Sequence, residues 1–258
     1  VVKPYRLERR NTKIIHIDID PAEIGKNLGT TIPLVGDIKV VFENLMRQEF
    51  TADYSEWTEE LAQRKMNYKD RVQFHPDYVN PCLFVKTLST MMEDDAVYVA
   101  DVGQNQLWSA EGYVMKHGRF LTTGGFGTMG YSIPAAIGVR AAMPDKQVVA
   151  VCGDGSFQMS LMELATMQQF DLPIKFVIMK NGYLGLVREY QHHTYNDRYS
   201  GVCLDGSPAF DKIAEAYGIR YFNLKNNEKM EETIRDFLDC DEAAMMVCDV
   251  YSYDVVKE

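Results

Sequence analysis

Short apolar stretches that alternate with helical patterns limit the possible folds of this chain more than any other feature. After Asn80 they read AVYVAD, QVVAVCGD, PIKFVIMKN, RYFNL and MMVCDV. Most of them are apolar throughout, which is typical of strands that a parallel sheet buries on both faces. Helical patterns such as PCLFVKTLSTMM, IPAAIGVRAAM and DKIAEAYG supply the crossovers that parallel strands require. The sequence therefore predicts an α/β fold over residues 79–258, with a parallel sheet and helices on both faces.

The residues before this run predict the end of a second α/β domain. KIIHIDID and IPLVGD have the pattern of strands, and IKVVFENLMRQ has that of an amphipathic helix. Asp20 followed by Pro21 is typical of a helix N-terminus, so AEIGKN is predicted to be helical as well. Two strands and two helices cannot close a domain, and we expect its beginning to lie upstream. We assign residues 1–52 to this domain, 53–78 to a polar connector with an exposed helix, and 79–258 to the next domain.

The charge balance argues against partners that are themselves negative. The chain has 258 residues, with 27 Lys and Arg against 37 Asp and Glu, a formal net charge of −10. Nucleic-acid backbones and anionic membrane surfaces would therefore repel it. Its cysteines are scattered without a CxxC spacing, and no apolar run is long enough to span a bilayer. We expect a cytoplasmic protein with no nucleic-acid or membrane partner, in which a local feature must hold any anionic ligand.

Such a feature is predicted at the carboxyl ends of the strands, where ligands bind in parallel α/β sheets. GDGS, residues 153–156, has glycines that let the backbone turn sharply. A helix that begins there would offer free N–H groups to an anion. Asp154 would repel that anion unless a cation lies between them, and its hard oxygens favour Mg²⁺. The alternative is an Asp helix cap with flanking glycines, because GDG alone is a weak signal.

Asn181 strengthens the prediction of a metal site. It follows the next strand along the chain, so one crossover would bring its amide oxygen to the same sheet edge as Asp154. There it would be a second ligand for Mg²⁺, with the loop backbone after it as a third. The alternative is a simple turn, since Asn-Gly is a common turn pair. The paired spacing favours the metal site.

A glycine-rich stretch offers a competing interpretation. Residues 125–130 read GFGTMG and satisfy the GxGxxG pattern of dinucleotide sites. However, TTGG precedes them instead of a buried strand, and no acidic residue ends a second strand at the expected distance. A glycine turn that lets a flat ligand approach fits the context better, and a nicotinamide-dependent dehydrogenase is a minor alternative.

Together these motifs resemble the thiamine-diphosphate enzymes, whose signature begins with GDG and ends in an Asn pair. The resemblance covers most of residues 79–218 and is greatest to the large catalytic subunit of the acetolactate (acetohydroxyacid) synthase family. It rests on DVGQNQLW, TTGGFGTMGYSIPAAIGV, VCGDGSFQMSLMELATMQQFDLPIKFVI, NGYLGLVREY and FDKIAEAYGI. IIHIDIDPAEIGKN resembles the last part of that family's middle, flavin-associated domain. The implied fold is the thiamine-diphosphate-binding fold, preceded by the end of the middle domain.

The resemblance also implies a cofactor site. Mg²⁺ would be held by Asp154, by the Asn181 side chain and by the backbone carbonyl of Tyr183, and Met129 would wedge the cofactor into its bent form. The implied cofactors are thiamine diphosphate and Mg²⁺, with FAD as an optional structural cofactor near Asp18. The positions implied to contact thiamine diphosphate or its metal are Gly103, Gln104, Asn105, Gly127, Met129, Asp154, Gly155, Ser156, Asn181, Tyr183, Leu184, Gly185 and Leu186.

Three positions depart from the family pattern and leave the substrate open. Lys180 replaces the first Asn of the pair, Asn105 stands where many synthases have His, and Tyr190 stands where many have a Trp that shapes the substrate channel. Asn105 still has donors for a phosphate. Met129 has an alternative role as an ordinary core methionine.

The resemblance places the Glu that activates the cofactor in the family's N-terminal domain. We therefore assign no catalytic residue within this chain, and we expect the chain alone to bind the diphosphate half of the cofactor without turnover.

The implied reaction is decarboxylation of pyruvate and condensation with a second 2-oxo acid, which gives 2-acetolactate or 2-aceto-2-hydroxybutyrate in branched-chain amino-acid biosynthesis. Small 2-oxo acids are the implied ligands, and a homodimer or homotetramer with a regulatory small subunit is the implied assembly. The first alternative is another thiamine-diphosphate-dependent 2-oxo-acid decarboxylase or oxidase. The second is a non-catalytic module that binds the cofactor.

Overall fold

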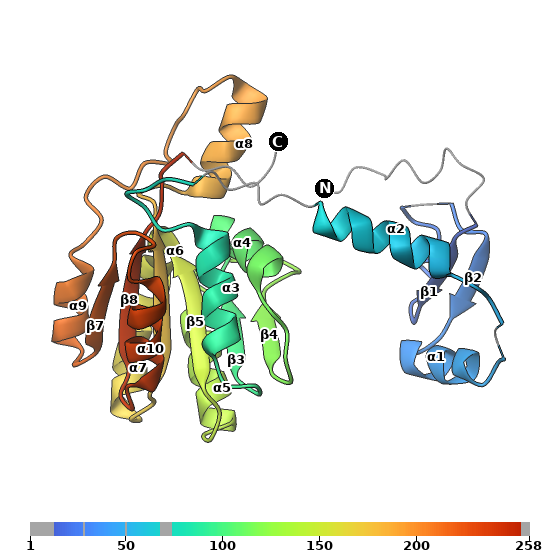
Figure 1. Cartoon of the computed structure of the whole chain (residues 1–258), viewed down its shortest axis with the longest axis horizontal. Coiled ribbons are helices and arrows are strands. Elements are labelled where there is room, and N and C mark those ends of the chain that lie inside the picture. Colours follow the sequence, from blue (N-terminus) through green and yellow to red (C-terminus); the bar gives the residue numbers. More distant parts are fainter. Residues whose placement is uncertain (1–12, 28, 50, 68–73, 254–258) are drawn as a thin grey trace. The chain divides into compact units, whose positions relative to one another are not determined.

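The chain divides into two compact units, Val1–Tyr68 and Lys69–Glu258. The computed structural model describes residues 13–27, 29–49, 51–67 and 74–253 (Figure 1). The predicted ranges 1–52 and 53–78 include residues 1–12 and 68–73, which lie outside the described residues, and the predicted domain boundaries stay predictions.

The first unit contains the two strands and the amphipathic helix that the sequence predicts. Its strands pair in parallel, and its elements are β1 (Ile15–Asp18), β2 (Ile32–Val35), α1 (Ile38–Met46) and α2 (Ser55–Met66). Helix α1 begins where Asp37 accepts hydrogen bonds from the backbone of Lys39 at 2.9 Å and Val40 at 3.3 Å. This is the usual N-cap arrangement for an Asp. Helix α2 lies in the segment expected to hold an exposed helix.

The predicted helix after Pro21 is wrong. Asp20 does accept a hydrogen bond from the Ala22 backbone at 2.8 Å, as an N-cap would. However, residues 21–27 form turns instead of a helix, and Gly25 has a positive φ of 75°. That left-handed conformation interrupts a right-handed helix after its first turn.

The second unit is built on a six-stranded parallel sheet, which confirms the predicted fold class. The strand order is β4-β3-β5-β6-β8-β7, and every pair is parallel. The strands are β3 (Val97–Ala100), β4 (Arg119–Thr122), β5 (Val148–Gly153), β6 (Lys175–Lys180), β7 (Arg220–Leu224) and β8 (Ala244–Asp249).

Helices cover both faces of this sheet (Figure 1). One face is covered by α3 (Pro81–Met91), α4 (Gln104–Gly112) and α10 (Met230–Asp239). The other is covered by α5 (Ser132–Ala142), α6 (Asp154–Ser160), α7 (Leu164–Gln169) and α9 (Phe210–Ala216). Successive strand residues point to opposite faces, so Val149 and Val151 of β5 enter one core while Val148 and Ala150 enter the other. The apolar strands are thus buried on both sides, as their composition predicts.

Three elements differ from the sequence prediction. The single helix expected over Ser156–Phe170 is divided into α6, a 3₁₀ turn at Leu161–Glu163 and α7. Strand β4 and helix α10 were not predicted.

Among the described helices, none is long and apolar enough to cross a membrane.

The strand order creates a crevice beside β3. From β3 the chain passes to β4 on one side and then to β5 on the other. The connections therefore diverge at the carboxyl ends of β3 and β5, and ligands bind at such switch points in open α/β sheets. The loop after β3 and the GDGS turn after β5 both open there.

Candidate functional site

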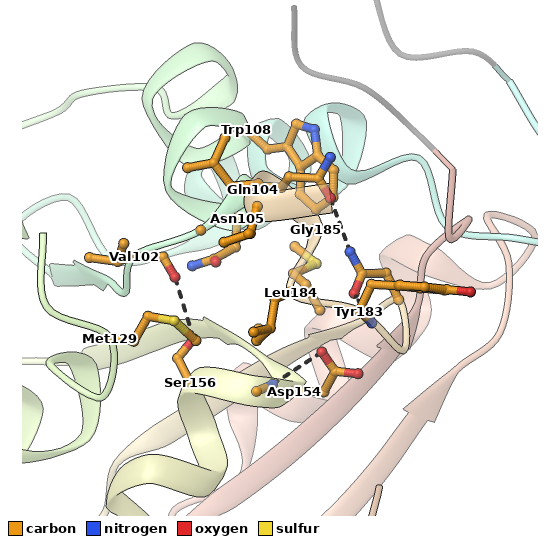
Figure 2. A pocket seen from close by; sticks show the side chains of 17 residues that line it. Val102, Gln104, Asn105, Trp108, Met129, Asp154, Ser156, Tyr183, Leu184 and Gly185 are labelled. Carbon is orange, nitrogen blue, oxygen red and sulfur yellow. Dashed lines mark hydrogen bonds between the residues drawn. The ribbon is translucent and has the colours of Figure 1, made fainter. Parts of the chain in front are cut away.

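A pocket lies at this switch point, between the loops that follow β3, β5 and β6 (Figure 2). It has about 520 Å³ of empty space between its walls, part of it open to solvent. Its walls are formed by Val102, Gly103, Gln104, Asn105, Trp108, Met129, Gly153, Asp154, Gly155, Ser156, Met179, Asn181, Tyr183, Leu184, Gly185, Leu186 and Val187.

The structure brings together every predicted cofactor residue except one. Gly127 is exposed and does not line the pocket. It has a positive φ of 64°, and no atom lies within 4 Å of the position that a Cβ would occupy. Gly127 allows the left-handed backbone conformation two residues before Met129. A contact between Gly127 and a ligand stays a prediction.

Asp154 is the buried charge of the pocket. Its Oδ1 accepts a hydrogen bond from the Gly155 backbone at 3.1 Å, and its Oδ2 accepts one from the Gly182 backbone at 2.9 Å. The second bond ties the turn after β5 to the loop after β6. Burial raises the pKa of Asp154 from 3.8 to about 6, although both hydrogen bonds act in the opposite direction. The carboxylate lies where a cation would stabilise it.

Asn181 and Tyr183 face the same space from the loop after β6. Asn181 Oδ1 accepts a hydrogen bond from the Tyr183 backbone at 2.9 Å, and its Nδ2 donates to Gln104 Oε1 at 3.0 Å. The Gly182 carbonyl and the Leu184 N–H both bind the segment around Cys203. The C=O and N–H groups of one trans peptide point in opposite directions, so the Tyr183 carbonyl, which shares its peptide with the Leu184 N–H, points away from that segment.

The ring of Tyr183 points away from the pocket (Figure 2). Its partners lie outside the site, with the Arg188 guanidinium 5.7 Å from the ring centroid and the Tyr253 ring 6.0 Å away. Only the backbone of Tyr183 is therefore placed to act as a ligand.

Asn105 and Ser156 line the pocket but already have protein partners. Asn105 Nδ2 donates to the backbone carbonyls of Asp101 at 2.9 Å and Val151 at 3.3 Å. Ser156 Oγ donates to the Val102 carbonyl at 3.4 Å, a long and weak bond. The Asn105 amide thus holds the loop after β3, and its donation to a phosphate stays a prediction.

Several apolar walls of the pocket were missed from the sequence. Trp108 is 1% exposed and lies one turn after Gln104 on α4. The helical spacing from Gln104 is the signal that places it on the same face. Val102 lies two residues after the buried strand β3, and Met179 is the second-last residue of β6. An apolar residue at these positions is expected in any buried strand and does not indicate a site.

Asp101 has a role that the sequence did not reveal. It is fully buried, and its Oδ1 accepts hydrogen bonds from the backbone of Val102 at 2.8 Å and Gly130 at 3.0 Å. Its Oδ2 accepts one from Ser132, the first residue of α5, at 2.7 Å. The carboxylate therefore fixes the turn that carries Met129 into the pocket.

Two family models match this chain. The model of the thiamine pyrophosphate enzyme C-terminal TPP binding domain matches residues 101–250. This range contains the whole pocket and covers more than half of the chain. The chain belongs to the thiamine pyrophosphate enzymes. The model of the central domain of the same enzymes matches residues 2–45, and the predicted resemblance is confirmed.

Curated relatives of this thiamine pyrophosphate (thiamine diphosphate) enzyme carry a more specific name. The acetolactate synthase large subunit of Porphyra purpurea is 38% identical over 93% of this chain and 42% of its own length. The acetolactate synthase of Arthrospira platensis is 40% identical over 84% of this chain and 39% of its own. The acetolactate synthase isozyme 3 large subunit of Escherichia coli K12 is 35% identical over 89% and 41%. The chain thus spans about two fifths of these relatives.

The pocket of this thiamine diphosphate enzyme has the chemistry that the cofactor and a hard cation require. Among the described residues, Asp154 is in no ion pair, and no cluster of three His, Cys, Asp or Glu residues forms a separate metal site. Helices α4, α6 and α8 (Gly185–Tyr195) all begin at the pocket, and none has a side-chain N-cap hydrogen bond. Their first N–H groups suit an anionic diphosphate. The residues fit Mg²⁺ with a diphosphate.

Replacing Asp101 with Ala is expected to destabilise this enzyme by about 2 kcal/mol, because the N–H groups of Val102, Gly130 and Ser132 would lose their acceptor. Urea denaturation at neutral pH measures the change. Asp101→Asn keeps one acceptor oxygen and should lose less. A D101A variant as stable as the wild type would show that these hydrogen bonds do not hold the turn.

Proposed function

We propose that this chain forms the cofactor-binding part of an acetolactate synthase large subunit. In the proposed reaction, pyruvate is decarboxylated and condensed with a second 2-oxo acid, giving 2-acetolactate or 2-aceto-2-hydroxybutyrate for branched-chain amino-acid biosynthesis. The observation that carries the proposal is the pocket at the β3/β5 switch point, where the GDGS and Asn181 loops meet. The names of its relatives support the choice of reaction.

The proposed metal ligands are Asp154, the Asn181 amide oxygen and the Tyr183 carbonyl. Carboxylate, amide and carbonyl oxygens are the hard ligands that Mg²⁺ prefers, and phosphate oxygens and water would complete its octahedron. Support comes from the Asp154–Gly182 hydrogen bond, which joins the two loops at 2.9 Å. The bound cation would balance the negative charge of Asp154, which burial disfavours.

The remaining walls would position the cofactor and exclude water. When bound, thiamine diphosphate supplies an electron sink for the decarboxylation of a 2-oxo acid. Met129 and Leu184 approach the pocket from opposite loops, and both lie close to Gly155, whose missing side chain leaves them room. A Cβ on Gly155 would lie 2.9 Å from Leu184 Cδ2 and 3.6 Å from Met129 Cε. No catalytic base is assigned within this chain.

The proposed function also includes the division of the chain into domains, the place of FAD and the assembly with other chains. We assign residues 1–52 to the middle domain, 53–78 to a connector and 79–258 to the cofactor domain, with FAD associated with the first. A cytoplasmic homodimer or homotetramer with a regulatory small subunit is proposed. Phe126 is 98% exposed and Met159 is 53% exposed near the turn that carries Met129. Phe and Met are enriched at interfaces between chains, so these two exposed side chains are consistent with the proposed assembly.

Incubation of the intact protein with pyruvate, thiamine diphosphate, Mg²⁺ and FAD tests the reaction. Acetolactate is expected, detected as acetoin that forms only after acid treatment, and chelation of Mg²⁺ should abolish it. Acetaldehyde as the main product would assign the protein to a decarboxylase instead. No consumption of any 2-oxo acid, with the cofactor still bound, would favour a non-catalytic module.

A further inference from the structure

A chain of hydrogen bonds connects the pocket to a buried carboxylate on α8. Glu189 is 4% exposed and does not line the pocket. Its Oε2 accepts a hydrogen bond from Gln104 Nε2 at 3.1 Å, and Gln104 Oε1 accepts one from Asn181 Nδ2 at 3.0 Å. Figure 2 shows the second of these bonds at the wall of the pocket. The chain of bonds thus runs from α8 through α4 to the loop after β6.

The carboxylate end favours one direction for both bonds, and the Tyr183 N–H that donates to Asn181 Oδ1 at 2.9 Å supports the same orientation of the Asn181 amide. An amide has a donor end and an acceptor end, but an ionised carboxylate only accepts. Gln104 must therefore turn its NH₂ group toward Glu189, which leaves its oxygen for Asn181. Asn181 must then turn its own NH₂ group toward Gln104, and its oxygen faces the opposite way. With the reverse orientation, the Asn181 NH₂ group would point at the proposed cation.

The packing around Gln104 leaves little freedom for another arrangement. Gln104 is 4% exposed, and its amide lies against the backbone of Gly185, where a Cβ would come within 2.0 Å of Gln104 Oε1. Glu189 lies four residues after Gly185 on α8, so both are on the same helix face. The first turns of α8 therefore contact the Gln104 amide at both its oxygen and its nitrogen.

We propose that Glu189 is a positioning residue for the metal site, which acts through Gln104 to keep the Asn181 carbonyl oxygen toward the cation. This rests on the proposed function, because it requires Mg²⁺ to bind at Asp154 and Asn181. Residues that orient metal ligands typically change metal affinity 10- to 100-fold when they are replaced.

Two variants of Glu189 separate orientation from charge. Glu189→Met removes the acceptor and keeps the length of the side chain, whereas Glu189→Gln removes the charge and keeps an acceptor. The dissociation constant of Mg²⁺ is measured by calorimetry on the intact protein with saturating thiamine diphosphate. We expect it to rise about 10-fold or more in E189M and to stay within about 3-fold of the wild type in E189Q. Glu215→Leu, on the exposed side of α9, is the control and should leave it unchanged.

Thermal unfolding of the metal-free variants separates positioning from simple packing. A lower melting temperature in E189M with wild-type Mg²⁺ affinity would overturn the proposal. So would an E189Q variant that binds Mg²⁺ at least 10 times more weakly than the wild type, because its acceptor is intact. E189Q keeps the shape of the side chain, so it can overturn the proposal even where E189M does not fold. A wild-type protein that binds no Mg²⁺ at all would instead refute the proposed metal site itself, and with it the role of Glu189.

Discussion

Replacing Asp154 with Asn is expected to weaken Mg²⁺-dependent binding of thiamine diphosphate roughly 1000-fold, because the proposed metal site would lose the one carboxylate among its proposed ligands. The same substitution is expected to stabilise the metal-free protein at pH 7.5. A gain in stability with a loss of binding is the mark of a functional charge, because a residue kept for folding would show the opposite.

The stability gain follows from the pKa of Asp154, which burial raises from 3.8 to about 6. Above pH 6 the folded protein carries a charge that is more stable in the unfolded chain, so this group lowers the stability. Below about pH 4 both states are protonated and the effect disappears. A shift of about two units corresponds to about 3 kcal/mol at most. Asn also gives up one acceptor for the N–H groups of Gly155 and Gly182, so a net gain of about 1–2 kcal/mol is expected.

Urea denaturation in the presence of a chelator, at pH 7.5 and at pH 4, measures this gain. Asp241→Asn, in the exposed loop before β8, is the matched control and should change neither stability nor binding. If D154N were less stable than the wild type at pH 7.5, Asp154 would serve the fold through the hydrogen bonds that it accepts from Gly155 and Gly182. Wild-type binding of the cofactor in D154N would contradict the assignment of Asp154 as a metal ligand.

Replacing Gly185 with Ala is expected to weaken Mg²⁺ binding on the order of 100-fold and to destabilise the metal-free protein. The new Cβ would lie 2.0 Å from Gln104 Oε1 and 2.6 Å from Asn181 Nδ2. Gln104 would have to move, and its hydrogen bonds to Asn181 and Glu189 would break together. The free energy of unfolding of the metal-free protein should fall by about 2–4 kcal/mol, because the buried Gln104, Asn181 and Glu189 side chains lose these partners.

Gly138→Ala on α5 is the control for Gly185→Ala. No atom lies within 4 Å of a Cβ at Gly138, so the variant should be as stable as the wild type or slightly more stable and should bind Mg²⁺ normally. Calorimetry and thermal unfolding of both variants give the comparison. Wild-type affinity in G185A would show that the Gln104 amide is free to move without effect on the metal site.

The sequence predicts the sheet, and it predicts that the proposed metal ligands lie together, because both depend on local patterns at strand ends. Asp154 follows one buried strand and Asn181 follows the next, and parallel pairing alone brings them to one edge. The chain of bonds from Glu189 could not be predicted in this way. It joins residues far apart in sequence, and which amide atom faces which depends on the packing of α8 against α4.

The missed elements have different physical reasons. Strand β4 is a short edge strand in which Arg119 is exposed, so its pattern is weak. Helix α10 was detectable, because Met230, Ile234, Phe237 and Leu238 form a buried stripe at helical spacing. The predicted helix after Pro21 is the opposite error. The hydrogen bond that Asp20 accepts from Ala22 is that of an N-cap, but the positive φ of Gly25 prevents the helix from continuing.

The location of the metal is the most direct test of the proposed cofactor site. Crystals of the intact protein grown with thiamine diphosphate and Mn²⁺ in place of Mg²⁺ would reveal the ion by its anomalous scattering. One peak is expected about 2.1 Å from the oxygens of Asp154, Asn181 and the Tyr183 carbonyl, with the diphosphate among the remaining ligands. A bound cofactor with no metal between these three oxygens would contradict the proposed site.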